Sequence, residues 1–120
     1  MKVLKFGGTS VGTPQRMKEV SKLITSDGKP KMVVLSAMSG TTNTLVEISD
    51  YLYKKNPEGA NTIINRLEQK YIRHAEEIYN TEEWREKTIQ FLHEEFDYLR
   101  SFTKIHFTSF EEKVILAQGE

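Results

Sequence analysis

The sequence predicts an α/β protein, and three observations lead to that class. The chain has 120 residues, which is enough for one domain with a modest core. Two short apolar runs, "MKVLKF" at residues 1–6 and "KMVVLS" at residues 31–36, are typical of strands. A stretch with helical spacing lies between them, and the order strand, helix, strand is typical of a parallel sheet.

Each part of this strand–helix–strand unit has its own signals. The two runs carry few polar residues, so we expect strands that are buried on both faces. Thr13 can cap the intervening helix and Pro14 suits its first position, while Gly28 can end it in a left-handed conformation. The apolar face of this helix is predicted to consist of Met17, Val20, Leu23 and Ile24.

The chain after residue 36 is predicted to be helical. A helix is expected to begin near Thr42 or Thr44, where Thr44 and Glu47 fit a capping box, and to end at Asn56-Pro57. A longer helix is expected from residue 58 to a break at 80–81. Its apolar stripe is Ile63, Ile64, Leu67, Tyr71, Ala75 and Ile78.

Two more helices complete the prediction. Thr81 is expected to cap the first, with Glu82 and Glu83 in its first turn. The last begins at Thr108 or Ser109, and Ser109 with Glu112 fits a capping box. Helical spacing predicts that the aromatic side chains of the first of these helices pack in the core, namely Trp84, Phe91, Phe96 and Phe102.

Composition excludes several classes of function. The formal net charge is zero, which argues against broad binding to nucleic acid. No apolar run approaches the roughly 20 residues that span a bilayer, and we expect no membrane association and a cytoplasmic location. The chain has no cysteine, which excludes disulfides and thiolate chemistry. His74, His93 and His106 lack the spacing of metal ligands, so no protein-bound metal is expected.

Both predicted strands end in loops of the same kind. "KFGGTSVGTP" follows the first strand and "SAMSGTTNT" follows the second. Each joins the carboxyl end of a strand to the start of a helix, which is the edge of an α/β sheet where ligands bind. Free backbone N–H groups and the positive end of a helix favour anions there. The two loops therefore predict a site for phosphate or carboxylate.

The first loop fits neither common glycine-rich motif. Gly7 and Gly12 have the spacing of a P-loop, but Thr13 stands where that motif has lysine. The pattern G-x-G-x-x-G also fails, because Thr9 occupies its middle glycine. The lysine is Lys5, which precedes the glycines and would supply a fixed positive charge for phosphoryl transfer. A tight turn with helix caps is the structural alternative for such a loop.

These segments resemble the aspartate kinases, within the amino-acid kinase superfamily. "KFGGTSVG" is similar to the first signature of that family, "VVLSAMSGTTNTL" to the second, and the terminal "QGE" to the start of the third. The resemblance runs along the chain but covers only the N-terminal part of a family member. It implies a three-layer sandwich of the amino-acid kinase type, represented here by its N-terminal βαβα part and a helical insert.

The resemblance also implies an activity. The family transfers the γ-phosphoryl group of ATP, with Mg²⁺ carried by the nucleotide, to the β-carboxylate of L-aspartate. The product is 4-phospho-L-aspartate, at the first step towards lysine, threonine and methionine. By similarity, Lys5 would stabilise the transferred group as the catalytic residue. The phosphate and ATP contacts would be Lys5, Gly7, Gly8, Thr9 and Ser10, and the substrate contacts would be Ser36, Thr42 and Glu120.

The same resemblance defines what a complete protein would add. Residues 1–56 would form the loop-bearing part and residues 57–120 a helical segment, without the nucleotide half and the regulatory ACT domains. Two strands also make a small sheet, and no closing cap follows Ala117. We therefore expect an N-terminal piece of a larger protein that is inactive by itself, and we expect the full-length protein to be a homo-oligomer, namely a dimer. A small natural α/β domain is the alternative.

Other functions remain open at this point. The chain is compatible with the kinase part of a bifunctional aspartate kinase–homoserine dehydrogenase. A superfamily kinase that acts on glutamate, acetylglutamate or UMP is a further candidate, although "KFGGTS" and "SAMSGTTN" favour aspartate. A candidate from a different class is a non-catalytic module that binds an amino acid or phosphate.

Overall fold

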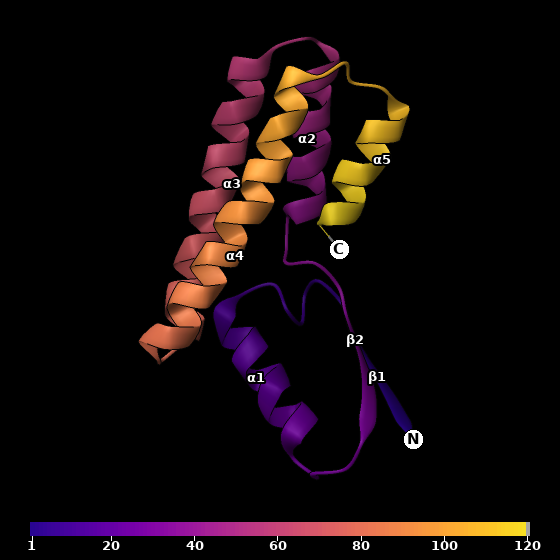
Figure 1. Cartoon of the computed structure of the whole chain (residues 1–120). Helices are drawn as coiled ribbons and strands as arrows, with labels where there is room; N and C mark the ends of the chain where they lie inside the picture. Colours follow the sequence, from indigo (N-terminus) through magenta and orange to yellow (C-terminus); the bar gives the residue numbers. More distant parts are fainter. Residues whose placement is uncertain (120) are drawn as a thin grey trace. The chain divides into compact units, whose positions relative to one another are not determined.

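The computed structural model describes residues 1–119 and confirms a mixed α/β chain (Figure 1). Two strands and one helix come first, and four further helices follow. Contacts divide the chain into two compact units, Met1–Ser39 and Gly40 onwards. The elements in chain order are β1 Lys2–Phe6, α1 Pro14–Thr25, β2 Lys31–Leu35, α2 Thr41–Tyr53, α3 Pro57–Ile78, α4 Glu82–Ser101, a 3₁₀ turn Phe102–Lys104 and α5 Ser109–Gln118.

The first unit is the predicted strand–helix–strand arrangement. β1 and β2 pair in parallel, with Lys2 opposite Lys31. Thr13 is the N-cap of α1 and its side chain accepts a hydrogen bond from the backbone N–H of Arg16 at 3.3 Å. Gly28 has a φ of +64° just after the helix. The predicted start and stop signals of α1 are therefore confirmed.

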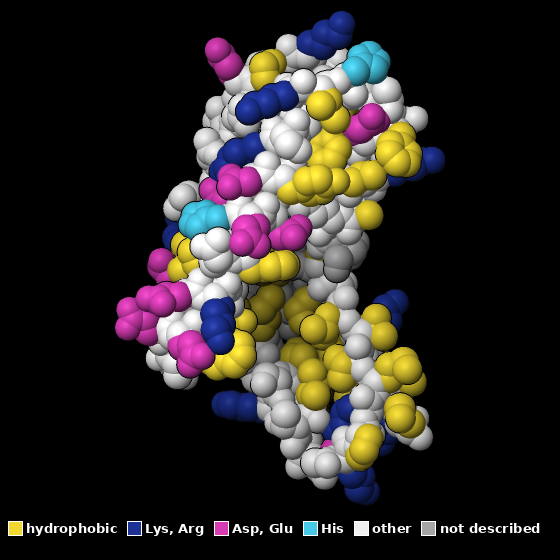
Figure 2. Space-filling view, in the orientation of Figure 1, with side chains coloured by type: hydrophobic (Ala, Val, Ile, Leu, Met, Phe, Trp, Pro, Cys, Tyr) yellow, Lys and Arg dark blue, Asp and Glu magenta, His cyan; other side chains and the backbone are white. Residues whose placement is uncertain are grey.

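The prediction that both strands are buried on both faces is wrong for the structure described. Val3 is 63% exposed and Val34 is 45% exposed, and Met32 and Leu35 are exposed as well. Figure 2 shows the corresponding hydrophobic surface over the strands. In the part of the chain described, no third strand lies beside these two. Pro14 is the one residue of α1 that is buried, so this helix covers little of the sheet. Apolar composition alone therefore does not bury these side chains.

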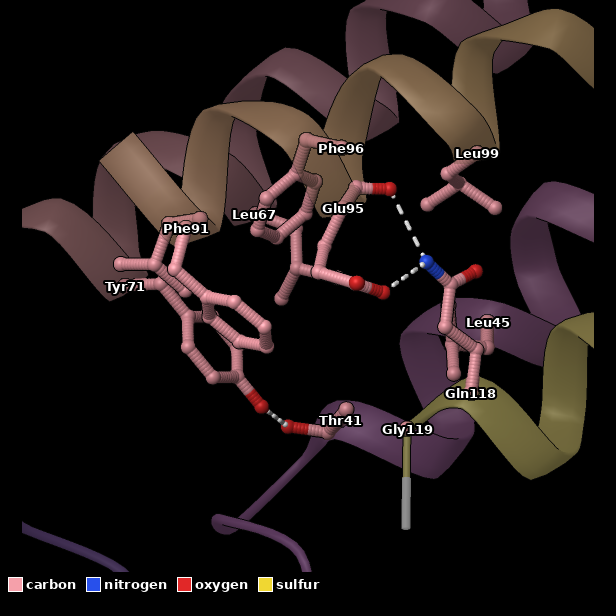
Figure 3. Close-up of a pocket in the computed structure, with 11 residues that line it drawn as sticks. Thr41, Leu45, Leu67, Tyr71, Phe91, Glu95, Phe96, Leu99, Gln118 and Gly119 are labelled. Atoms are coloured by element: carbon pink, nitrogen blue, oxygen red, sulfur yellow. Dashed lines mark hydrogen bonds between the residues drawn. The ribbon is translucent and has the colours of Figure 1, made fainter. Parts of the chain in front are cut away.

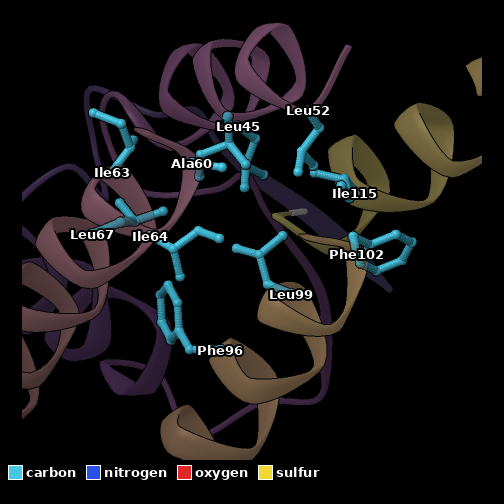
Figure 4. Close-up of a cluster of buried hydrophobic side chains, with 11 residues drawn as sticks. Leu45, Leu52, Ala60, Ile63, Ile64, Leu67, Phe96, Leu99, Phe102 and Ile115 are labelled. Atoms are coloured by element: carbon cyan, nitrogen blue, oxygen red, sulfur yellow. The ribbon is translucent and has the colours of Figure 1, made fainter. Parts of the chain in front are cut away.

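The second unit is a helical bundle. Its core is a cluster of buried side chains from α2, α3, α4, the 3₁₀ turn and α5, in which Ile64, Phe96 and Leu99 point toward one another (Figure 4). Ile48, Ile64 and Ile115 are fully buried. The predicted apolar stripe of α3 supplies part of this core through Ile63, Ile64 and Leu67. Ala75 of the same stripe is buried as well.

Three predictions need correction, namely the aromatic stripe of α4 and the caps of α2 and α5. Trp84 and Phe91 are 56% and 57% exposed, so only the later aromatic residues of that stripe enter the core. α2 begins after Gly40, and Thr44 instead donates its hydroxyl to the Gly40 carbonyl at 2.9 Å. The capping box of α5 is formed by Thr108 and Glu111 rather than by the next residue pair. The N-cap of α2 therefore lies about one turn before the predicted box at Thr44. The N-cap of α5 lies one residue before the predicted box at Ser109.

Candidate active site

The first glycine-rich loop is a compact turn at the carboxyl end of β1. The backbone N–H groups of Ser10 and Val11 both donate to the carbonyl of Gly7, at 3.0 and 3.2 Å. Val11 is 4% exposed, so its side chain anchors the turn. Thr9 and Ser10 are exposed at the surface of the loop. The turn therefore holds its apolar residue inward and its hydroxyl residues outward.

The two predicted loops lie side by side within the first unit. The Ser36 N–H donates to the Phe6 carbonyl at 3.1 Å, which extends the strand pairing by one residue. A Cβ placed on Gly8 would lie 3.5 Å from Ser36 Oγ, and one placed on Gly12 would lie 3.1 Å from Ser39 Cβ. Small residues thus allow the first loop to pack against the start of the second. Ser36 lies directly beside the glycines of the first loop.

Lys5 occupies an exposed position on β1, immediately before Phe6 and the loop. Among residues 1–119 its ammonium group makes no hydrogen bond or ion pair. A second cation contacts the loop, since Arg16 Nη1 donates to the Thr9 carbonyl at 2.6 Å. The loop is therefore tied to the first turn of α1, while the charge of Lys5 is not neutralised by the part of the chain described.

The remainder of the second loop belongs to the helical unit. Gly40 has a φ of +82°, which suits glycine, and it is the N-cap of α2 without a side-chain cap. Thr42 is exposed in the first turn of α2. Thr41 is only 3% exposed, and its hydroxyl forms a hydrogen bond with the hydroxyl of Tyr71 on α3 at 2.5 Å. Glu120, the remaining predicted substrate residue, lies outside the described residues.

A cavity of about 160 Å³ opens beside Thr41 in the helical unit (Figure 3). Its walls are mainly apolar side chains of α2, α3 and α4, and the end of α5 closes one side. Gln118 of α5 donates its side-chain amide to the Glu95 backbone carbonyl at 2.9 Å and to the Glu95 carboxylate at 3.1 Å. These bonds fix the end of α5, and thereby Gly119, against the bundle.

Two residues of the site were not identified from the sequence. Tyr71 was assigned to the apolar stripe of α3, although a buried tyrosine hydroxyl requires a partner and this requirement was an available signal. Arg16 gave no signal, because an arginine in the first turn of a helix is ordinarily a solvent-exposed residue. The functional roles predicted for Lys5, Ser36 and Thr42 stay predictions.

All three histidines belong to the helical unit. His74 Nδ1 is buried without a hydrogen-bond partner among the described residues, and burial lowers the pKa of this histidine. His93 Nδ1 lies 3.3 Å from the carboxylate of Glu68. In the part of the chain described, no three His, Asp or Glu side chains gather as a metal site would require. None of the described helices combines the length and apolar character needed to cross a membrane.

Sequence comparisons with known proteins cover nearly the whole chain. The family model described as the amino acid kinase family matches residues 1–118. The chain is 41% identical over 80 residues to aspartokinase 3, chloroplastic, of Arabidopsis thaliana, a match that covers 63% of this chain and 14% of that protein. It is 38% identical over 71 residues to an aspartate kinase of Pseudomonas putida, covering 56% of this chain and 17% of that protein.

A third relative matches over a shorter stretch. Aspartokinase 2, chloroplastic, of Arabidopsis thaliana is 52% identical over 50 residues, which is 40% of this chain and 9% of that protein. The matched segments therefore cover between 9% and 17% of the length of these three relatives, so the chain spans only a small part of each.

Proposed function

Because the chain belongs to the amino acid kinase family, we propose that it forms the loop-bearing part of an aspartate kinase. The observation that carries this proposal is the pair of adjacent loops at the carboxyl ends of β1 and β2, with Lys5 on the strand that leads into the first. The relatives named aspartokinase or aspartate kinase support aspartate as the acceptor. The protein would phosphorylate L-aspartate at the first step towards lysine, threonine and methionine.

The proposed reaction is a phosphoryl transfer between two anions. A β-carboxylate oxygen of L-aspartate forms a bond to the γ-phosphorus of ATP, and the bond from that phosphorus to the bridging oxygen breaks. The electron pair leaves on ADP, and the product is 4-phospho-L-aspartate. The carboxylate is already ionised at neutral pH, so no general base is required. The protein must position the two reactants and stabilise negative charge.

The described residues suit these two tasks. Lys5 would stabilise the charge that spreads over the transferred group. Gly7, Gly8, Thr9 and Ser10 offer backbone N–H and hydroxyl donors to phosphate oxygens. These donors suit the phosphate oxygens rather than a metal ion, so Mg²⁺ would arrive bound to the nucleotide.

The amino-acid substrate would be held by the second loop and the end of the chain. Ser36 and Thr42 offer hydroxyl groups to its carboxylates. Glu120 would pair with its α-ammonium group. A cytoplasmic location and a dimeric full-length enzyme stay predictions of the same proposal.

The test is Lys5→Ala in the full-length protein. We expect kcat for aspartate phosphorylation to fall by roughly 10² or more, because a preorganised charge stabiliser is lost. Lys2→Ala is the matched control, since Lys2 lies on the same strand opposite Lys31 and away from the loop. Unchanged turnover in Lys5→Ala would remove Lys5 from the mechanism. A wild-type protein that phosphorylates no aspartate would refute the proposed function.

A related expectation concerns residues 1–120 by themselves. We expect this chain to show no phosphorylation of aspartate, because the resemblance places the nucleotide half of the site further along. Measurable turnover by the 120-residue chain, in the same coupled assay for ADP release, would contradict this expectation.

A further inference from the structure

Three helices meet at Thr41 in the helical unit. Its hydroxyl is hydrogen-bonded to Tyr71 of α3 at 2.5 Å. Its methyl group faces the end of α5, because a Cβ placed on Gly119 would lie 3.2 Å from Thr41 Cγ2 and 2.6 Å from Leu45 Cδ1. Only glycine fits at position 119 without displacement of these side chains. Thr41 is therefore held on one side by α3 and on the other by the end of α5 (Figure 3).

This junction lies next to two proposed substrate residues. Thr41 immediately precedes Thr42, and Gly119 immediately precedes Glu120. Consecutive Cα atoms are about 3.8 Å apart, so a displacement of Thr41 is passed directly to Thr42. α3 approaches the same loop a second time, since Lys70 Nζ lies 3.7 Å from the position of a Cβ on Gly40. Lys70 and Tyr71 of α3 thus lie beside Gly40 and Thr41, respectively.

We propose that Tyr71 is a positioning residue, which fixes Thr41 and thereby the location of Thr42 for binding of the amino-acid acceptor. This inference rests on the proposed function, and it gives the helical segment a role in the reaction. Apolar packing alone would bury the start of α2. The hydrogen bond between the Thr41 and Tyr71 hydroxyls also fixes the direction in which the Thr41 side chain points. A misplacement of about 1 Å in a positioned group can cost on the order of 10²-fold in rate, so that direction matters.

The hydroxyl pair makes a specific experiment possible in the full-length enzyme. Tyr71→Phe and Thr41→Val each remove one hydroxyl with little change in shape, and the double variant removes both. Thr41→Ser keeps the hydroxyl. Tyr98→Phe is the matched control, because Tyr98 is half exposed on α4 and packs edge-on against Phe102. For each variant we would measure KM for L-aspartate, KM for ATP, kcat and the thermal midpoint.

We expect Tyr71→Phe and Thr41→Val to raise KM for L-aspartate about tenfold while KM for ATP is unchanged. The effect of the double variant should be smaller than the sum of the two single effects, because both single variants remove the hydrogen bond between Thr41 and Tyr71. Thr41→Ser and Tyr98→Phe should resemble the wild type.

Several outcomes would overturn the inference. An unchanged KM for aspartate, an equal rise in both KM values, or a lower thermal midpoint without a change in KM would show a purely structural hydroxyl pair. Strictly additive effects in the double variant would show that the two hydroxyls act separately. A failure of the proposed function is distinguishable, because it is seen in the wild type, which would then not phosphorylate aspartate at all.

Discussion

Gly12 is the glycine of the first loop with the least space for a side chain. A Cβ at this position would lie 2.7 Å from the backbone carbonyl oxygen of Gly8 and 3.1 Å from Ser39 Cβ. The first of these atoms belongs to the backbone, so it cannot move aside as a flexible side chain would. Gly7 differs, because no atom lies within 4 Å of a Cβ placed there.

We expect Gly12→Ala to lower the free energy of unfolding by about 1–3 kcal/mol, the usual cost of overpacking a closed site. The loop must shift, so kcat for phosphoryl transfer should fall as well. Denaturant unfolding of the full-length protein and a steady-state assay would measure both. Gly7→Ala is the control for the unfolding measurement, because it adds the same methyl group where there is space. Equal free energies of unfolding for the two variants would show that the close approach of Gly12 to Gly8 is not a constraint.

The places of individual residues were predictable where they lie at strand ends, while their roles stay predictions. Lys5 lies near the end of β1, the glycines and Ser36 follow strands, and the meeting of the two loops follows from parallel pairing. Tyr71 was not predicted as a site residue, because its spacing on α3 is that of a core residue. Its contact with Thr41 joins positions 30 residues apart, and helical periodicity carries no information about such a pair.

At the scale of elements, α3 and α4 are joined by a partly buried ion pair. Arg100 Nη2 of α4 lies 2.6 Å from the Glu68 carboxylate of α3, and Glu68 is 6% exposed. The hydrogen bond from Arg100 to Glu68 raises the pKa of Arg100. Arg100 also donates to Asn65 at 2.8 Å and to the exposed Asp97 at 2.9 Å. The arginine therefore connects the two longest helices of the bundle.

We expect Arg100→Met to lower the free energy of unfolding by about 2 kcal/mol. Loss of one partner from a buried pair costs roughly 3–5 kcal/mol, and the partial exposure of the arginine reduces that figure. Asp97→Asn is the matched control, with an expected change of about 0–1 kcal/mol because Asp97 is exposed. Urea unfolding would measure both, and equal effects would mean that burial of Glu68 contributes nothing to the pair.

The helices themselves were predictable, but their first residues were less so. Thr13 and Pro14 marked the start of α1 correctly, because the capping group is a side chain. α2 begins at Thr41, and its N-cap is Gly40, which supplies a backbone conformation and no capping side chain. A serine or threonine pattern cannot reveal such a start, which is why the box predicted at Thr44 was wrong.

At the scale of the whole molecule, the two units differ in how completely they bury their apolar side chains. The helical unit encloses its own core, whereas β1 and β2 expose theirs. The apolar runs in the sequence are typical of strands that are buried on both faces, and a two-stranded sheet does not bury them in this way. Because the relatives are several times longer, we expect other segments of a longer protein to cover the strands.

Val34→Asp tests this expectation. In the full-length protein we expect a loss of about 3 kcal/mol or more in the free energy of unfolding, because an unpaired carboxylate would be buried. In residues 1–120 alone the change should stay near 0.5–1 kcal/mol, since Val34 is 45% exposed there. Equal effects in the two proteins would show that the strands remain exposed in the complete molecule.

The unequal burial of the two units has a consequence for biosynthesis. A ribosome releases the N-terminus first, so β1, α1 and β2 emerge before the helices of the second unit. The helices can nevertheless fold earlier, because Ile48, Ile64 and Ile115 find all their partners within the same unit. The strands, made first, would wait for a later part of the chain, and during that interval they would be a binding site for chaperones.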